Sequence, residues 1–355
     1  MLKSVSRLIS AVGFLILTVL LVLGAKFLPE LVFAFYPEFS RKVLTALSNI
    51  TALVPFALWE LLLGALVLWF VISLIRAICK GRCVRWLMGV VLVLSVGVFL
   101  FMGLWGLNYY APSINERMGI GGKQYTVEEL KEATLYYLDM ANASAREVDR
   151  DEDGFYMAAE FEELSVEAGR SFVPLSEDYE CFDGSKARVK YLLSSPLMAK
   201  AGTTGVFVCL TGESSVSTLT YEISVPYTMC HEAAHRLGFA REDEANFAAF
   251  LACCESQRVD FRYSGYYHAF LYCYNALYEA DPEAAREVWN EVSETLYEDM
   301  SRASIHYEAL RDETASKVSD AVYDTYLKGF SVSEGVQSYG QVTDLLLVWY
   351  FEELR

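Results

Sequence analysis

Basic residues are scarce over most of this sequence. Of its 29 Lys and Arg, 20 follow residue 107, together with 43 of its 46 Asp and Glu, and they form no basic patch large enough to hold a polyanion. An acidic surface of this kind repels phosphates, so nucleic acid is excluded as a partner. Residues 1–107 have the opposite balance and are strongly apolar. We therefore expect a membrane anchor over residues 1–107 and a water-soluble domain over residues 108–355.

Paired cysteines of the metal-binding type are also missing. The chain has eight cysteines, but none forms a C-x-x-C pair, so a zinc site made of thiolates is not indicated. Cys253 and Cys254 fall in an apolar helical stretch, where buried free thiols are expected. The spacing of the other cysteines requires no disulfide. Histidine is rarer still, with four in 355 residues.

Three apolar runs are present, at residues 8–24, 52–75 and 86–107. A helix needs about 20 apolar residues to cross the hydrocarbon core of a bilayer. The second and third runs meet this length easily. The first is shorter and continues less cleanly toward residue 28, and we keep it as a span because no signal-peptidase cleavage site follows it. The sequence therefore predicts three transmembrane helices.

The basic residues around these runs predict the orientation of the chain. Lys3 and Arg7 precede the first run, and four more basic residues fill the loop at residues 76–85. Loops rich in Lys and Arg stay in the cytoplasm, which places residues 108–355 outside it. The loop at residues 26–51 is the exception, because it has three basic and two acidic residues and would also lie outside.

Glu60 lies inside the second apolar run. A carboxyl group within the membrane is a candidate functional residue. The alternative, which we favour, is that Glu60 lies near the outer interface, or is neutral and paired with another helix.

The soluble part has mainly helical patterns. Helices are expected at residues 127–147, 227–237, 242–257, 263–280, 282–300, 302–327 and 339–354. Short strands are expected at residues 187–193, 205–210 and 223–225. Thr126 is a suitable cap for the first of these helices, and the Ser/Thr-rich tract at residues 212–220 is expected to be a surface loop. The fold class is therefore mainly α with a small β-sheet, after three transmembrane helices.

The segment with the clearest chemistry is His231-Glu232-Ala233-Ala234-His235, an HExxH motif. Pro226 suits the first turn of a helix here, and Gly238 suits its end. His231 and His235 leave the same helix face one turn apart, which is the arrangement that holds one Zn²⁺. Glu232 is rotated by about 100° and can serve as general base without binding the metal. Five-residue motifs occur by chance, but two of the four histidines fall in this one.

A catalytic zinc site needs a third protein ligand. The position where a longer HExxHxxGxxH motif has its third histidine is occupied by Arg241, which cannot bind a metal. We therefore expect a carboxylate from the next helix, folded back beside His235. Glu242 is the first candidate, because Asn246 lies four residues further on and can orient a histidine.

Two other carboxylates compete for this role. Glu244 would lie across the helical hairpin from His235 and is the close alternative third ligand. Glu255 lies 20 residues beyond His235, a familiar spacing in zinc peptidases, but no residue four positions later can support it. The residues leave this choice open, and a charged first turn also suits the helix dipole without any metal.

Other residues have possible roles in handling a peptide. Residues 205–210 are either an edge strand that pairs with an extended peptide or an interior strand. Tyr263, His268 and Tyr339 can each donate a hydrogen bond to an oxyanion, although such residues more often pack between helices.

Residues 231–247 read HEAAHRLGFAREDEANF and resemble the signature of DUF3810, a family of bacterial membrane proteins of unknown function. The resemblance extends to residues 105–112, 204–207, 211–213, 261–266 and 338–340. The family is grouped by likeness with zinc peptidases of the gluzincin type. The resemblance implies a zincin-like soluble domain that hydrolyses peptide bonds.

The segment Glu242-x-x-Ala245-Asn246 also resembles the third-ligand segment of the HtpX and CAAX-prenyl-endopeptidase membrane proteases and of the ImmA/IrrE peptidases. This resemblance implies that Glu242 is the ligand. Two features differ from the HtpX pattern: Asn246 stands in place of Asp, and the gap between His235 and Glu242 is very short.

The sequence as a whole predicts a membrane-anchored zinc metallopeptidase in a bacterial cell membrane, with its catalytic domain outside the cytoplasm. A zinc-activated water would attack the peptide bond with Glu232 as general base, and the substrate would be a membrane-proximal peptide or protein. The alternative is a catalytically silent zincin-like sensor or binding module, against which the complete motif argues. An intramembrane protease would need ligands inside the apolar runs, where the motif does not lie. No oligomeric state is indicated.

Overall fold

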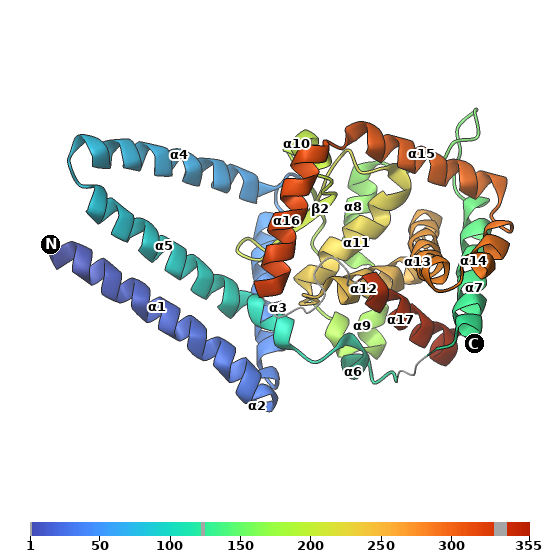
Figure 1. Ribbon diagram of the computed structural model, residues 1–355, viewed down its shortest axis with the longest axis horizontal. Coiled ribbons are helices and arrows are strands. Elements are labelled where there is room, and N and C mark those ends of the chain that lie inside the picture. The colour runs from blue at the N-terminus through green and yellow to red at the C-terminus, as the bar shows by residue number, and fades with distance from the viewer. Residues whose placement is uncertain (1, 122–124, 330–338) are drawn as a thin grey trace.

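The computed structural model describes residues 2–121, 125–329 and 339–355, and helices dominate it (Figure 1). Three long helices leave the same side of a helical body: α1 (Leu2–Phe27), α4 (Leu58–Cys79) and α5 (Cys83–Leu104). Each is long and apolar enough to cross a membrane, and most of their large apolar side chains are exposed. The three predicted spans are therefore confirmed as apolar helices, and α1 and α5 pack along one another.

The first turn of α4 is held by carboxylates in two different ways. Glu213, from the body, accepts hydrogen bonds from the backbone amides of Leu58 (2.8 Å) and Trp59 (2.9 Å). These amides have no partner within the helix, so a body carboxylate caps a membrane helix. Glu60 accepts hydrogen bonds from the amides of Leu193 (2.6 Å) and Ser194 (3.0 Å). Glu60 is thus paired at the end of the span, by a loop of the body.

Two helices connect α1 with α4: α2 (Pro29–Phe33) and α3 (Tyr36–Thr51). Leu44 of α3 is fully buried, and Ser48 hydrogen-bonds Ser185 of the body across 2.6 Å between their Oγ atoms. Gly212 has a φ of +66°, and a Cβ at this position would come 2.8 Å from the Ser48 nitrogen. Only glycine permits this close contact, so Gly212 allows the chain before Glu213 to pack directly against α3.

The sheet has three short strands in the order β1-β3-β2: β1 (Lys190–Tyr191), β2 (Gly205–Val208) and β3 (Glu213–Val216). β1 is parallel to β3, and β2 is antiparallel to it, with Val206 opposite Ser215. The strands expected at residues 187–193 and 205–210 are confirmed in shorter form. The strand expected at residues 223–225 is wrong, because residues there form a 3₁₀ turn, η3 (Glu222–Ser224).

The surface loop expected at residues 212–220 is also wrong, because this tract contains the central and fully buried strand β3. Two of its polar side chains, Glu213 and Ser214, have specific partners inside the body. The Lys190 ammonium lies 2.6 Å from a Glu213 carboxylate oxygen, and Ser214 donates to the backbone oxygen of Glu232 at 2.6 Å. The polar composition of residues 212–220 therefore does not indicate exposure to solvent.

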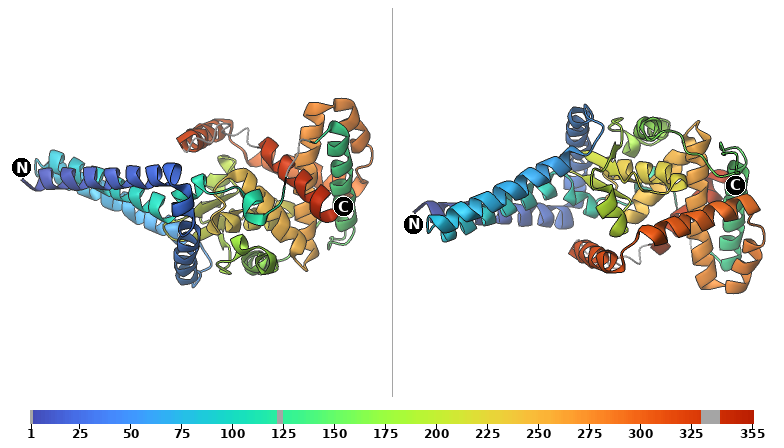
Figure 2. Two further views of the ribbon diagram at one scale, coloured as in Figure 1. Left: turned by 90° about the horizontal axis from the view of Figure 1, so that it is seen from below. Right: turned by 90° about the horizontal axis from the view of Figure 1, so that it is seen from above.

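The helices of the body surround two central ones, α11 (Val225–Arg236) and α12 (Glu242–Glu255), as both views of Figure 2 show. The segments before them are η1 (Gly106–Tyr110), α6 (Ile114–Met118), α7 (Val127–Ala145), α8 (Phe161–Arg170), α9 (Leu175–Asp178), η2 (Glu180–Phe182) and α10 (Ser195–Lys200). Those after them are α13 (Val259–Ala280), α14 (Pro282–Trp289), α15 (Glu294–Leu310), α16 (Glu313–Gly329), α17 (Tyr339–Trp349) and η5 (Tyr350–Leu354).

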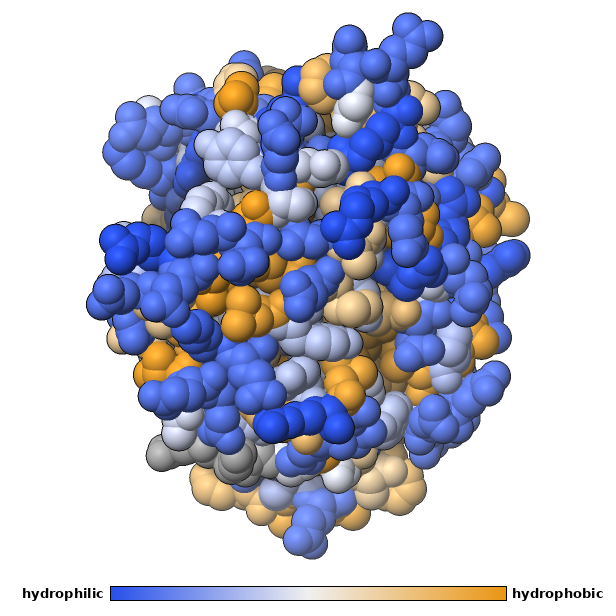
Figure 3. All heavy atoms as spheres, turned by 90° about the vertical axis from the view of Figure 1, so that its right-hand side faces the viewer, coloured by the Kyte–Doolittle hydropathy of each residue, from blue (hydrophilic) through white to orange (hydrophobic). Residues whose placement is uncertain are grey.

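Local signals explain several of these boundaries. Thr126 and Glu129 form a reciprocal capping box at the start of α7, which confirms the predicted cap. The single helix expected at residues 282–300 is two, because Ser293 starts a new helix by accepting from the Leu296 amide. The face opposite the membrane helices is largely hydrophilic with small scattered apolar areas (Figure 3), in agreement with the acidic composition after residue 107.

Candidate metal centre

The HExxH motif lies on α11, in the middle of the body. Pro226 occupies the first turn of this helix, where its missing N–H costs nothing. The helix ends before Gly238, whose φ of +94° turns the chain sharply toward α12. The backbone oxygen of His235 also accepts a hydrogen bond from Trp105 Nε1 at 2.8 Å. The motif is therefore part of the hairpin of α11 and α12, and it contacts Trp105 at the end of the membrane helix α5.

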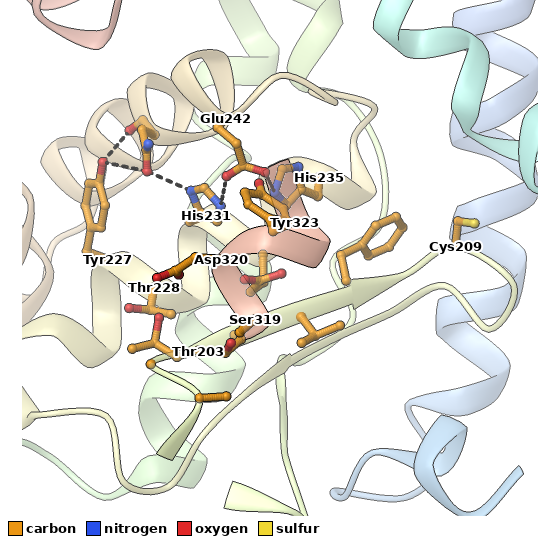
Figure 4. A pocket seen from close by; sticks show the side chains of 18 of the residues that line it. Thr203, Cys209, Tyr227, Thr228, His231, His235, Glu242, Ser319, Asp320 and Tyr323 are labelled. Atoms are coloured by element: carbon orange, nitrogen blue, oxygen red, sulfur yellow. Dashed lines mark hydrogen bonds and ion pairs between the residues drawn. The ribbon is translucent and has the colours of Figure 1, made fainter. Parts of the chain in front are cut away.

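His231, His235 and Glu242 come together at this hairpin, and Figure 4 shows their side chains pointing toward one another. One ligand atom from each lies within 4.8 Å of the others. The Nε2 atoms of His231 and His235 lie 3.2 Å and 3.4 Å from the two carboxylate oxygens of Glu242. Two imidazole nitrogens and one carboxylate are the donor set of many catalytic zinc sites.

The opposite nitrogen of each imidazole is fixed by an oxygen acceptor. His231 Nδ1 lies 2.8 Å from Asn246 Oδ1, and His235 Nδ1 lies 2.7 Å from the backbone oxygen of Phe239. With the proton on Nδ1, donated to these oxygens, the lone pair of each Nε2 faces Glu242. The prediction that Asn246 orients a histidine is therefore matched by this contact.

His235 and Glu242 shift each other's pKa strongly when no metal is between them. Burial lowers the pKa of His235, but the Glu242 carboxylate outweighs this effect and raises that pKa to about 9. Burial raises the pKa of Glu242, but the histidines opposite hold that pKa well below its usual value. A negative carboxylate and two imidazoles thus share one small site and favour positive charge at its centre.

Glu232 lies beside this group and has no hydrogen-bond partner for its Oε2 atom among the described residues. The residue is only 5% exposed, and burial raises the pKa of its carboxyl group to about 7. Strand β2 passes so close to it that a Cβ at Gly205 would clash with Glu232 Oε1. A buried carboxylate without a partner fits a role toward a bound water or substrate.

The other two candidate ligands lie elsewhere. Glu244 accepts a hydrogen bond from the Ile114 amide at 2.7 Å and pairs with Arg117 and Arg241, so it anchors the start of α6. Glu255 is exposed at the far end of α12. Among the candidates, the structure brings only Glu242 to the two histidines.

The candidate oxyanion donors also lie in different places, and only some of them are near the histidines. Tyr263 is fully buried in the core and donates to Asp299 at 2.5 Å, away from the histidines. His268 lines the same cavity as the motif, stacks on Tyr227 with ring centroids 4.1 Å apart, and has its Nε2 3.2 Å from Ser224 Oγ. The side chain of Tyr339 is outside the described residues.

A cavity of about 560 Å³ opens onto the site. Its walls include β2, the histidines and Glu242, together with Phe101 and Trp105 from the end of α5. A further wall, which the sequence does not reveal, is formed by Ser319, Asp320 and Tyr323 of α16 (Figure 4). No motif marks these residues, because only the packing of α16 on the body brings them here.

The position of β2 shows whether residues 205–210 form an edge strand or an interior strand. β2 pairs only with β3, so it is an edge strand of the described sheet, and it also lines the cavity. Its free edge is therefore available to the backbone of an extended peptide next to Glu232.

Comparison with known proteins gives one match. The family model described as "Protein of unknown function (DUF3810)" matches residues 35–347, which include the last two membrane helices and nearly all of the body. No curated protein and no solved structure matches the chain. Because the match covers most of the sequence, including the whole HExxH hairpin, the chain belongs to the DUF3810 family.

Proposed function

We propose that this protein is a membrane-anchored zinc metallopeptidase of the gluzincin type, with a zincin-like active site formed by α11, α12 and the sheet. His231, His235 and Glu242 would hold Zn²⁺. The observation that carries this proposal is the convergence of two Nε2 atoms on the Glu242 carboxylate, with each Nδ1 bound to an oxygen. Such outer contacts are typical of histidines that bind zinc.

A bound Zn²⁺ would lower the pKa of a coordinated water and polarise the carbonyl group of the substrate. Glu232 would take a proton from this water while the water oxygen forms a bond to the carbonyl carbon. The C–N bond then breaks, and Glu232 returns the proton to the leaving nitrogen. Glu232 is buried beside the three ligands, and its Oε2 atom has no hydrogen-bond partner in the described part of the chain, which supports this role.

The free edge of β2 would hold the substrate as an extended strand. Backbone hydrogen bonds to an edge strand bind a peptide with little dependence on its sequence. Gly205 brings this edge against Glu232, so a peptide bond paired here lies beside the general base.

Metal content measured together with turnover tests the proposal. Full-length protein purified in detergent should contain about one zinc per chain by elemental analysis. His231→Ala and Glu242→Ala should lose the zinc, and Glu232→Gln should keep it but lose hydrolysis of a mixed peptide pool. A wild-type protein that stays metal-free after incubation with zinc would refute the proposed peptidase function.

Glu255→Ala is the matched control, because it removes an exposed carboxylate from the same helix α12. It should keep both zinc and turnover. The second candidate function, a silent zincin-like sensor, requires that the wild type binds zinc and yet hydrolyses no more peptide than Glu232→Gln does. An intramembrane protease is disfavoured, since the proposed ligands lie on α11 and α12 and not on the candidate spans.

A further inference from the structure

The cavity at the metal centre has one wall that belongs to the membrane anchor. Phe101 lies in the last turn of α5, inside one of the candidate spans, and lines this cavity together with Trp105 and Tyr109. The indole of Trp105 lies 6.0 Å from the His235 ring, centroid to centroid. The proposed zinc ligands are therefore about one side chain away from the end of a membrane span.

Strand β2 runs from the catalytic residue toward this wall. Its first residue, Gly205, lies against Glu232. At the other end, Phe207 packs on Trp105 with ring centroids 5.6 Å apart, and Cys209 is buried in one cluster with Trp105. At about 3.3 Å per residue, the two ends of β2, Gly205 and Val208, lie about 10 Å apart. An extended peptide on the free edge of β2 thus has one end at Glu232 and the other at the membrane helices.

The membrane end of the cavity is chemically distinct from the catalytic end. It presents the aromatic side chains of Phe101, Trp105, Tyr109 and Phe207. Tryptophan and tyrosine rings prefer the headgroup layer of a bilayer, so this end lies at that depth. A peptide that ends in water would have to leave it to reach this wall, whereas one that emerges from the bilayer arrives there directly.

From this geometry we infer that the substrate is the juxtamembrane segment of a membrane-anchored protein. Given the length of β2, the cut falls about four to six residues from the membrane end of its anchor. The inference rests on the proposed peptidase function and adds the substrate class to it. The distance between Glu232 and the end of α5 acts as a ruler for the cleavage position.

The test uses full-length zinc-loaded protein in liposomes and two peptide libraries. One library carries a randomised segment of 20 residues joined to a hydrophobic transmembrane helix, with the helix at either end, and the other carries the same segment without a helix. The anchored library should be cleaved at least tenfold faster. Mass spectrometry should locate the cuts about four to six residues from the anchor, since an extended chain advances about 3.3 Å per residue.

A variant of the aromatic wall separates a role in substrate choice from general damage. Phe101→Ala should slow cleavage of the anchored library at least fivefold while its zinc content stays at one per chain. Phe99→Ala is the matched control, because Phe99 is on the same helix but packs on Phe14 of α1. It should cleave the anchored library at the wild-type rate.

Different failures have different meanings. Equal cleavage of the two libraries, or cuts spread evenly along the anchored segment, would overturn the inference and leave the peptidase in place. Cleavage of neither library by zinc-loaded protein would overturn the proposed function, and the inference with it.

Discussion

Glu242 and Glu244 stand two positions apart in the same helical turn and have unrelated partners. Glu242 faces the two histidines, whereas Glu244 binds the Ile114 amide and two arginines. The motif spacing alone places His231 and His235 on one face of a helix, so this part of the site could be predicted from the sequence. The choice between the two glutamates could not, because it depends on the turn at Gly238 and on α6, which precedes the motif by more than a hundred residues.

Asn246 is the residue at which the proposed metal site can be weakened without touching a ligand. Asn246→Ala removes the oxygen that orients His231 and should weaken zinc binding about 10- to 100-fold, the usual effect of losing such a contact. Asn246→Asp keeps an oxygen acceptor and should bind zinc nearly as well as the wild type. Competition with a fluorescent zinc chelator measures both affinities. Equal affinities for the alanine variant and the wild type would contradict the orienting role.

At the scale of elements, helices were easier to predict than strands. Long apolar runs and the capping box at Thr126 specify their helices locally. Strand β3 has no such signal, because its Glu and Ser residues read as a loop and are buried only through partners far along the chain. The helix expected at residues 302–327 overlaps α16 (Glu313–Gly329), but its start is wrong, because α15 continues to Leu310. The place of α16 over the cavity depends on packing that no local pattern encodes.

The contact between β3 and α4 makes the sheet depend on a buried ion pair. Glu213 is fully buried and pairs with Lys190 while it caps α4. Lys190→Met leaves a buried carboxylate without its cation and should destabilise the protein by ~3–5 kcal/mol. Lys190→Met combined with Glu213→Gln removes both charges and should destabilise it less. Thermal unfolding in detergent gives the order of stability of the wild type and the two variants. A double variant less stable than Lys190→Met would disprove this account.

For the molecule as a whole, the arrangement of charge predicts which side of the membrane the body occupies. The described structure has two exposed free cysteines, Cys79 and Cys83, and both lie where α4 turns into α5. In intact bacterial cells, a membrane-impermeant maleimide should leave them unlabelled, because the distribution of basic residues predicts that this loop stays in the cytoplasm. A cysteine placed in the body by Glu279→Cys, in a background where Cys79 and Cys83 are serine, should be labelled.

Permeabilised cells provide the control for this experiment, since both proteins should then react. The reverse pattern in intact cells, with the loop labelled and the body protected, would place the body in the cytoplasm.

The hydrogen bond from Trp105 to the backbone of His235 has a consequence for how the protein matures. The anchor precedes the body in the chain, so the aromatic wall of the cavity is synthesised and inserted before the helix that bears the histidines exists. The cavity is finished only when the later part folds onto the earlier one at the membrane. Proteolytic release of the body would remove Phe101 and Trp105 from the cavity, and with them the part of the wall that we propose positions the substrate. The proposed peptidase would then have no soluble active form, and its activity would stay confined to the membrane in which it was assembled.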